Sequence, residues 1–418
     1  MLHLSADDTV PGRSLRIGYL QVGPAAHGIC RYGRLLAAEA CRRADLSILR
    51  EDLELDGDPA RDRRRIADAA SRLSTADVVH VQVSLWRAGS WGAGARAGHN
   101  LRTFRRGCRA PIVFTLHDVT VLLPFENEKP LAVLRRGVRE VGKGLLRPLV
   151  HRLRGTPPPG ASIPRWNLDG FQAWRLARWV IDVGSVTFVL TGTEERLLVS
   201  MGLSRGTTLI PHFVEEPPSP VPATRPSTPG RKKVIVAGFI FEAKGHQMMV
   251  EAMTMLPDVE VLFVGGPSVG AEASDSVAQL TRLARDLGVL DRLRFTGYLP
   301  EDAYQRYLME ADLAVCPFGP RKSASSSLSS LIAAGCPIVA SDIPLIGEYN
   351  ALVPGAIATF SPHTTGALAA AVRRRLARPR DEAAAGLAEL RRRLSIRVVY
   401  DQHLVHYRQA ARDARRRA

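Results

Sequence analysis

The sequence is short of the features that mark several classes of protein. Its 418 residues include only five cysteines, with no CxxC pair: Cys30, Cys41, Cys108, Cys316 and Cys336. This scatter argues against a disulfide framework and a zinc site, and it fits a reducing compartment. No apolar run is long enough to cross a bilayer, and the N-terminal stretch lacks the apolar core of a secretory signal. We therefore expect a cytoplasmic protein that binds no metal.

Acidic residues are also in deficit. The chain has 41 Asp and Glu against 57 Lys and Arg, a formal net charge of +16. Such an excess indicates nucleic acid, an anionic membrane surface or phosphorylated substrates as partners, or simply a surface rich in solvated arginine. No zinc-finger spacing, RNA-binding signature or regular interleaving of aromatic residues is present, so nucleic acid is not the expected partner.

What the chain does have is two series of short, β-branched segments that alternate with helical ones. Buried strands are expected within residues 14–23, 76–83, 110–118, 185–192 and 207–213, and then within 233–239, 259–267, 292–299, 313–318 and 337–341. This alternation predicts an α/β fold with two doubly wound parallel sheets. We predict domains at 1–214 and 233–390, a Pro- and Ser-rich linker at 215–232, and a final helix within 391–418 that packs back on the first domain.

The segment 125–180 is unusual for an α/β domain. It contains a basic, roughly amphipathic stretch at 129–154 with leucines and valines at helical spacing. Three interpretations stay open: a helix on an anionic membrane surface, a flap over a substrate, and an inserted helical pair packed on the domain.

A neutral stretch rich in serine, residues 323–342, follows an expected strand. Leu328, Leu331 and Ile332 repeat at helical spacing, and Gly335 suits a helix stop. The serines would thus lie between a strand's carboxyl end and a helix N-terminus, where an open α/β sheet binds ligands and a phosphate finds unpaired N–H groups. The alternative is that they only cap the helix.

Three further residues occupy comparable places. Gly28 would let the backbone approach a diphosphate after the first strand. Lys244, followed by Gly245, begins a helix after a strand and could place a positive charge on a phosphate. His117 ends the strand in "FTLHD" and could hydrogen-bond a substrate hydroxyl. The alternatives are that Lys244 is an exposed lysine and that His117 is a structural histidine.

Taken in order, these segments resemble those of a known family. The run "GPAAHGICRYGRLLA", "DVVHVQ", "TLHD", "LIPHFVE", "AGFIFEAKGHQMMVEAM", "RFTGYLPEDAYQRYLMEADLAVCPF" and "LIAAGCPIVASDIP" is similar to retaining GT-B glycosyltransferases of glycosyltransferase family four. The resemblance covers nearly the whole chain. It implies two Rossmann-like domains that face each other across a cleft, with the acceptor on the first and a nucleotide-sugar on the second.

The resemblance also implies roles for individual residues. Gly28 would lie near the diphosphate, His117 would face the donor sugar, and Lys244 would neutralise the leaving phosphates. The loop Gly297, Tyr298 and Leu299 would hold the base through its backbone. No metal or cofactor is implied, because the nucleotide-sugar, by default a UDP-sugar, is a co-substrate.

The chain departs from the family pattern at three positions. Phe239 stands where the family has an arginine, and Lys322 and Ser330 stand where it has two glutamates. Some branches carry a Ser-Ala-Ser element here, as this chain does at 323–325. We expect Ser323, Ser325, Ser326, Ser327 and Ser330 to contact the donor in place of the glutamates, and Arg321 and Lys322 to supply the missing charge.

The resemblance therefore predicts a retaining, metal-independent glycosyltransferase. The acceptor stays open among a lipid-linked sugar, a polysaccharide end and a small metabolite, and peripheral contact with an anionic membrane stays open with it. The loss of both glutamates favours an alternative, a catalytically degenerate protein that binds a nucleotide-sugar or serves as an accessory subunit. A phosphorylase or an epimerase on the same fold is a third interpretation.

Overall fold

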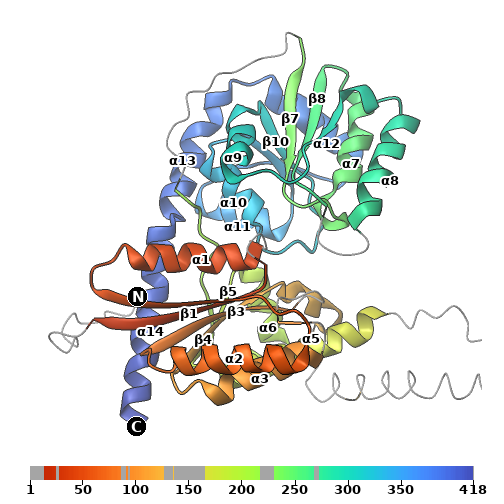
Figure 1. Ribbon diagram of the computed structural model, residues 1–418. Helices are drawn as coiled ribbons and strands as arrows, with labels where there is room; N and C mark the ends of the chain where they lie inside the picture. Colours follow the sequence, from red (N-terminus) through yellow and green to blue (C-terminus); the bar gives the residue numbers. More distant parts are fainter. Residues whose placement is uncertain are drawn as a thin grey trace, which may run out of the picture. The chain divides into compact units, whose positions relative to one another are not determined.

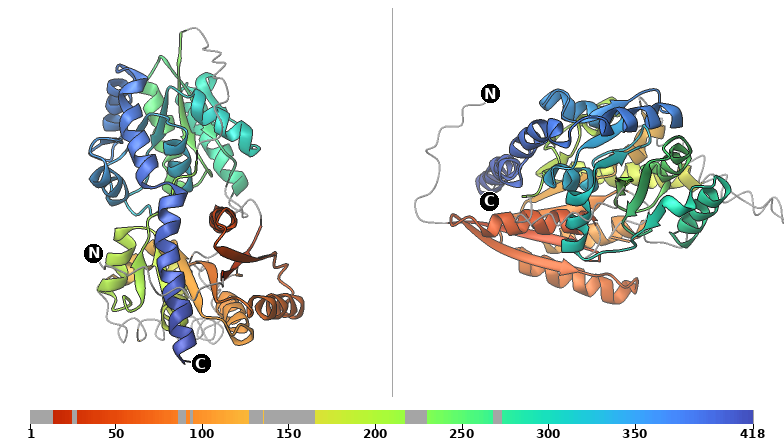
Figure 2. Two further views of the ribbon diagram at one scale, coloured as in Figure 1. Left: turned by 90° about the vertical axis from the view of Figure 1, so that its left-hand side faces the viewer. Right: turned by 90° about the horizontal axis from the view of Figure 1, so that it is seen from above.

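The computed structural model describes residues 14–24, 28–85, 91–92, 95–126, 135, 165–216, 230–267 and 273–417. Contacts divide these residues into two units. The first holds the described residues up to Val189, then Glu195–Leu209 and the residues from Tyr400 onward, and the second holds Leu190–Glu194 and Ile210–Val399. Within each unit, helices cover both faces of a twisted sheet (Figures 1 and 2).

The sheet of the first unit is entirely parallel, with the order β2-β1-β3-β4-β5-β6. Its strands are β1 (Leu15–Val22), β2 (Leu46–Leu53), β3 (Val78–Ser84), β4 (Ile112–His117), β5 (Val186–Val189) and β6 (Thr207–Leu209). The accompanying helices are α1 (Gly28–Cys41), α2 (Pro59–Leu73), α3 (Ala95–Gly107), η1 (Val119–Phe125), α5 (Arg165–Val183) and α6 (Gly192–Ser200), with most of α14 (Ile396–Arg417).

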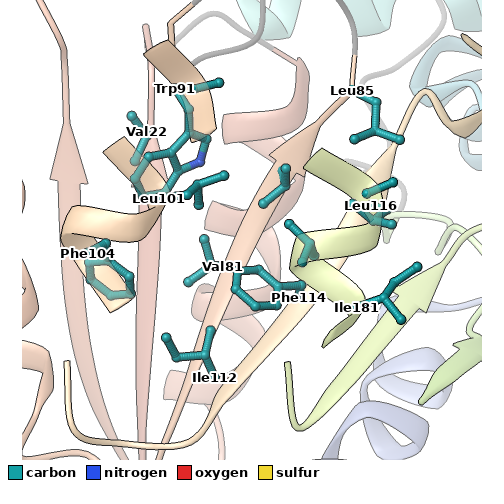
Figure 3. Packing of buried hydrophobic residues seen from close by; sticks show 14 of the residues in the cluster. Val22, Val81, Leu85, Trp91, Leu101, Phe104, Ile112, Phe114, Leu116 and Ile181 are labelled. Carbon is teal, nitrogen blue, oxygen red and sulfur yellow. The ribbon is translucent and has the colours of Figure 1, made fainter. Parts of the chain in front are cut away.

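One face of this sheet is apolar. Val81 of β3 and Ile112, Phe114 and Leu116 of β4 are all buried and point to the same side, where they meet residues of the covering helices such as Phe104 of α3 (Figure 3). Successive residues of a strand point to opposite faces, so the residues between these lie on the other side. Many side chains of that second face are polar.

The sheet of the second unit is also parallel, with the order β12-β11-β10-β7-β8-β9. Its strands are β7 (Lys232–Ala237), β8 (Val259–Val264), β9 (Leu293–Phe295), β10 (Leu313–Cys316), β11 (Ile338–Ser341) and β12 (Ala358–Phe360). The helices are η2 (Glu242–Lys244), α7 (His246–Ala252), η3 (Met253–Met255), α8 (Ala273–Asp286), η4 (Leu290–Arg292), α9 (Glu301–Glu310), α10 (Ser326–Ala333), α11 (Pro344–Leu352), α12 (Thr365–Leu376), η5 (Arg380–Ala383) and α13 (Ala384–Arg393).

The predicted fold class is confirmed: both units are doubly wound parallel sheets. Each of the ten predicted segments contains a strand, and the serine-rich stretch leads into α10. Gly335 follows that helix with a φ of +64°, as a C′ glycine does. The prediction missed β2 and β12. Both lie at a sheet edge, where a strand is packed on fewer sides and its sequence is less apolar.

The boundaries of the two units differ at their edges from the predicted domains. Residues 210–216 and Leu190–Glu194 group with the second unit, and α14 divides between the two at Val399 and Tyr400. Most of the predicted linker and, except for Arg135, the basic stretch 129–154 lie outside the described residues. Among the helices that the structure describes, none is both long and apolar enough to span a membrane.

Candidate functional site

The loops after β7 and β10 lie at the switch point of the second sheet. From β7 the chain continues to β8 and β9 on one side, whereas β10 and β11 lie on the other. Ligands of open α/β sheets bind outside the carboxyl ends of the strands at such a point. Lys244 follows β7, and the serine-rich stretch follows β10. The two predicted phosphate-binding elements therefore meet at the expected edge of the sheet.

Lys244 is held directly by two of these serines. Its Nζ donates hydrogen bonds to Ser325 Oγ, at 3.2 Å, and to Ser327 Oγ. It also lies 4.9 Å from the ring centroid of Phe318, a cation–π contact. Only 5% of Lys244 is exposed, so the alternative of a solvent-exposed lysine is wrong. The structure brings together the lysine and the helix N-terminus that the sequence indicated separately.

Burial changes the charge of this lysine. Burial, and after it the nearby positive charge of Lys322, lower the pKa of Lys244 to about 7. The amine and the ammonium are therefore both populated near neutral pH. A bound anion would favour the ammonium, because an opposite charge raises the pKa of an amine.

Two glycines make the close packing around Lys244 feasible. Gly238, with a φ of +104°, leaves room for Ser327 Oγ and Lys244 Nζ, which would lie 3.1 and 3.2 Å from a Cβ at that position. Gly245 has a φ of +72°, and a Cβ there would overlap the carbonyl of Pro317. Both backbone conformations favour glycine.

The other serines of the stretch bind groups of the protein itself. Ser323 Oγ donates to the carboxylate of Glu194, and Ser326 Oγ lies 3.4 Å from His212 Nε2. Ser330 Oγ donates to the backbone carbonyl of Ser326 at 3.0 Å. In this state these hydroxyls organise the loop and helix start.

Capping is also part of the role of this stretch. Ser325 is the N-cap of α10, and its Oγ accepts a hydrogen bond from Leu328 N at 3.4 Å. The same hydroxyl also accepts a hydrogen bond from Lys244 Nζ. One side chain therefore both caps the helix and contacts the lysine. Beside it, Lys322 Nζ donates to the Ala324 carbonyl at 3.1 Å, and Arg321 is exposed.

The loop Gly297–Leu299 follows β9 and reaches the ends of β7 and β8. Tyr298 is 58% exposed, its hydroxyl donates to the Pro267 carbonyl, and its ring lies 6.2 Å from that of Phe239 in a T-shaped arrangement. Phe239, where the sequence resemblance led us to expect an arginine, therefore forms half of an aromatic pair beside the predicted base loop. Leu299 is partly buried and packs on the apolar core.

In the first unit, His117 ends β4 and is 7% exposed. Its Nε2 lies 2.8 Å from Gln82 Oε1, and its ring meets the edge of the Tyr32 ring at 5.3 Å. The next residue, Asp118, has a φ of +61° and accepts a hydrogen bond from Ser84 Oγ at 2.8 Å. A non-glycine residue in the left-handed region is uncommon and often marks a functional site. Gly28 is the first residue of α1.

Sequence reasoning missed Glu194, His212 and Gln82. Glu194 is fully buried, and its carboxylate accepts from Leu190 N at 3.0 Å, while Thr191 Oγ1 accepts from Glu194 N at 3.2 Å. The Thr-x-x-Glu spacing could have indicated this helix start, but not its contact with Ser323.

In the part of the chain that the structure describes, no three His, Cys, Asp or Glu side chains form a group that could hold a metal ion.

Comparisons with known proteins agree with this architecture. Residues 231–378 match the family described as glycosyl transferases group 1. A D-inositol 3-phosphate glycosyltransferase of Mycolicibacterium gilvum (strain PYR-GCK) is 30% identical over 115 residues, which is 28% of this chain. The match spans a quarter, 25%, of the length of that relative.

Solved structures resemble nearly the whole chain. Sucrose-phosphate synthase from Thermosynechococcus elongatus has a TM-score of 0.65 at 16% identity, covering 94% of this chain and 98% of that one. Anabaena HepE in complex with UDP and glucose has a TM-score of 0.63 at 14% identity, covering 93% and 98%. The UDP-forming trehalose-phosphate synthase of Burkholderia xenovorans has a TM-score of 0.61 at 14% identity, covering 95% and 99%. The chain thus has the GT-B fold, with a group 1 glycosyl transferase match over most of its second unit.

Proposed function

We propose that this protein is a glycosyltransferase that moves a sugar from a nucleotide-diphosphate sugar to an acceptor hydroxyl. One observation carries the proposal: a buried lysine and a serine-capped helix N-terminus meet at the switch point of the sheet that matches the group 1 family. That arrangement suits the diphosphate of the donor, because N–H groups, hydroxyls and an ammonium converge on one place.

The same residues suit the chemical step. Breaking the sugar–phosphate bond builds negative charge on the leaving phosphate, and a group that binds this charge more tightly than the ground state accelerates the reaction. Lys244, Ser325 and Ser327 would supply that stabilisation, with Lys322 as an added positive charge nearby. His117 of the first unit would contact the sugar. No metal or further cofactor enters this proposal.

We further propose retention of the anomeric configuration, by a same-face displacement in which the departing phosphate accepts the proton of the acceptor. The resemblance to family four supports this mechanism, which requires no carboxylate at positions 322 and 330. UDP is the proposed nucleotide, because solved structures with this fold are described as holding or forming UDP. A degenerate, nucleotide-binding accessory protein is the second candidate, favoured by the absence of both family glutamates.

Calorimetric titration with UDP, GDP, dTDP and ADP tests the donor site. We expect the wild-type protein to bind one of them, and Lys244→Met to bind it at least about tenfold more weakly, which corresponds to ~1.4 kcal/mol. Lys232→Met is the matched control, because this lysine of the same unit has a side chain that is 58% exposed. It should leave the affinity unchanged.

Three results separate the candidates. Binding of none of the nucleotides would contradict both the transferase and the nucleotide-binding accessory protein. An equal loss of nucleotide affinity in Lys244→Met and Lys232→Met would show that Lys244 is not part of the nucleotide site. If the protein binds a nucleotide but releases none from any nucleotide-sugar with any acceptor tested, the accessory protein is favoured.

A further inference from the structure

The second face of the first sheet carries a column of polar side chains. Tyr19 of β1 pairs with His80 of β3, and Gln82 of β3 pairs with Thr115 of β4. His117 lies two residues after Thr115 and so on the same face. All five residues are at least 93% buried, since the most exposed of them, His117, is 7% exposed. A sheet covered on both faces usually carries apolar residues on each, so this column requires hydrogen-bond partners within the protein.

The C-terminal helix α14 supplies one of those partners. The hydroxyl of Tyr407 lies 2.7 Å from His80 Nδ1, and both residues are fully buried. His403 of the same helix meets Phe188 of β5 with ring centroids 4.9 Å apart. These residues from Tyr400 onward belong to the first unit, so α14 covers the polar face of its sheet.

From His80 the hydrogen bonds continue toward the carboxyl edge of the sheet. His80 Nε2 lies 3.2 Å from Gln82 Nε2 and 2.8 Å from Thr115 Oγ1, and Gln82 Oε1 lies 2.8 Å from His117 Nε2. A chain of hydrogen-bonded groups therefore runs from Tyr407 through His80 and Gln82 to His117. Its far end is the histidine that the proposed function places at the sugar.

The direction of each of these hydrogen bonds follows from the protonation of His80 and from the two ends of the Gln82 amide. Burial keeps the pKa of His80 well below its usual range, so its ring is neutral and carries one N–H. An amide nitrogen can only donate, so His80 Nε2 accepts from Gln82 and the hydrogen of His80 is on Nδ1, directed to Tyr407. Gln82 Oε1 can only accept, so the hydrogen of His117 is on Nε2.

We propose that Tyr407 is a positioning residue that, through His80 and Gln82, sets which ring nitrogen of His117 carries the hydrogen. This series of hydrogen bonds holds the hydrogen of His117 on Nε2, so Nδ1 of the neutral ring is an acceptor. This inference rests on the proposed function for its role in catalysis: an acceptor nitrogen receives a hydrogen bond from a sugar hydroxyl, whereas the other tautomer would donate one. It extends the functional site to a residue on the last helix.

Removal of the Tyr407 hydroxyl should reverse the direction of the hydrogen bonds that lead from His80 through Gln82 to His117. In Tyr407→Phe, the N–H of His80 Nδ1 would face an apolar ring, and a buried donor without a partner is costly. His80 avoids this cost by moving its hydrogen to Nε2. His80 Nε2 would then donate, with Thr115 Oγ1 at 2.8 Å as one acceptor, and Gln82 Nε2 at 3.2 Å would face it donor to donor. Gln82 relieves this contact by turning its oxygen to His80 and its nitrogen to His117, and the hydrogen of His117 moves to Nδ1. The substitution keeps the aromatic ring, so its packing against the sheet is retained.

Nitrogen-15 NMR of the full-length protein labelled at histidine tests this reversal, because protonated and unprotonated ring nitrogens have well-separated shifts. The His117 signals are assigned by their loss in His117→Gln. We expect the hydrogen of His117 on Nε2 in the wild-type protein and on Nδ1 in Tyr407→Phe. Tyr400→Phe is the matched control: it removes a buried hydroxyl of the same helix that bonds Tyr19, at 2.8 Å, and it keeps the Tyr407 hydroxyl that meets His80. It should leave His117 unchanged.

Gln82→Met tests the connection itself. Methionine has about the length of glutamine but neither donates nor accepts strongly. In the Gln82→Met background, Tyr407→Phe should no longer move the hydrogen of His117. A wild-type His117 that already carries its hydrogen on Nδ1, an unchanged tautomer in Tyr407→Phe, or an equal effect of Tyr400→Phe would each overturn the inference.

Nucleotide titration distinguishes failure of this inference from failure of the proposed function. Tyr407→Phe should bind UDP within about twofold of the wild-type affinity, because Tyr407 lies in the first unit and the nucleotide site in the second. If the wild-type protein bound no nucleotide but the tautomer still reversed, the donor site would be refuted and the positioning chain would stand.

Discussion

At the scale of single residues, the site depends on one lysine whose surroundings are built from serine hydroxyls and a phenylalanine ring. Lys244 could be predicted as a phosphate ligand because it follows a strand and precedes a glycine. Its partners Ser325 and Ser327 lie 81 and 83 residues further along the chain. The sequence indicated that both elements lie at a sheet edge, but it could not indicate that the lysine is buried, which requires the ring of Phe318 and the absence of a Cβ at Gly238.

Burial of Lys244 makes the stability of the protein depend on pH. The folded state holds this amine with a pKa of about 7, against the ordinary lysine value of 10.5. Between these values the unfolded state binds a proton that the folded state does not, so the contribution of Lys244 to the free energy of unfolding rises with pH. Below pH 7 both states are protonated, and the full cost of burying the charge is present.

Replacement of Lys244 by methionine should remove this dependence. We expect the melting temperature of Lys244→Met, relative to the wild-type protein, to be highest below about pH 7 and to fall steadily toward about pH 10. Thermal unfolding of both proteins across that range, with Lys232→Met as control, measures the difference. A difference that does not vary with pH would show that Lys244 is not buried in this way.

At the scale of elements, α10 combines two tasks at its first turn. The Oγ of its N-cap residue, Ser325, accepts hydrogen bonds from both Leu328 N and Lys244 Nζ. The helix itself could be predicted from the spacing of Leu328, Leu331 and Ile332 and from Gly335. The two missed strands show the opposite case: β2 is only partly buried along most of its length and β12 has three residues, so neither has a strong apolar pattern.

The two tasks of the cap can be separated by comparison with another helix of the same unit. Thr364 caps α12, where its side chain accepts from Ala367 N at 3.3 Å. Ser325→Ala and Thr364→Ala should each lower the free energy of unfolding by about 1 kcal/mol, measured by urea unfolding. Only Ser325→Ala should also weaken nucleotide binding in calorimetry. Equal nucleotide affinities in the two variants would limit Ser325 to capping.

At the scale of the whole molecule, the last helix belongs to the fold of the first unit although it follows the second in sequence. Three of its aromatic residues, Tyr400, His403 and Tyr407, are fully buried, and Tyr407 bonds His80 across 327 positions of sequence. The basic end beyond them is exposed: Arg415 reaches Asp77 at 2.8 Å, and Arg416 and Arg417 follow.

Deletion of residues 400–418 should therefore destabilise the first unit selectively. Removal of several buried aromatic side chains costs more than about 3 kcal/mol, so we expect faster hydrogen exchange in β1, β3 and β4 while β7 and β10 keep their protection. Deletion of residues 416–418 alone should change neither unit. Hydrogen exchange with mass spectrometry measures both variants, and uniform loss of protection in the two sheets would contradict this assignment of α14.

The sequence by itself determined the α/β class, the order of most strands and helices, and the places of Lys244, the serine-rich stretch and His117 at strand ends. These features depend on local periodicity and on glycine and proline positions, which are readable within ten to twenty residues. Only the tertiary structure decided that Ser323 meets Glu194, that Lys244 is enclosed by Ser325 and Ser327, and that His117 is joined through Gln82 and His80 to Tyr407. A hydrogen bond depends on atomic distances of about 3 Å, and such distances between remote positions are set by packing.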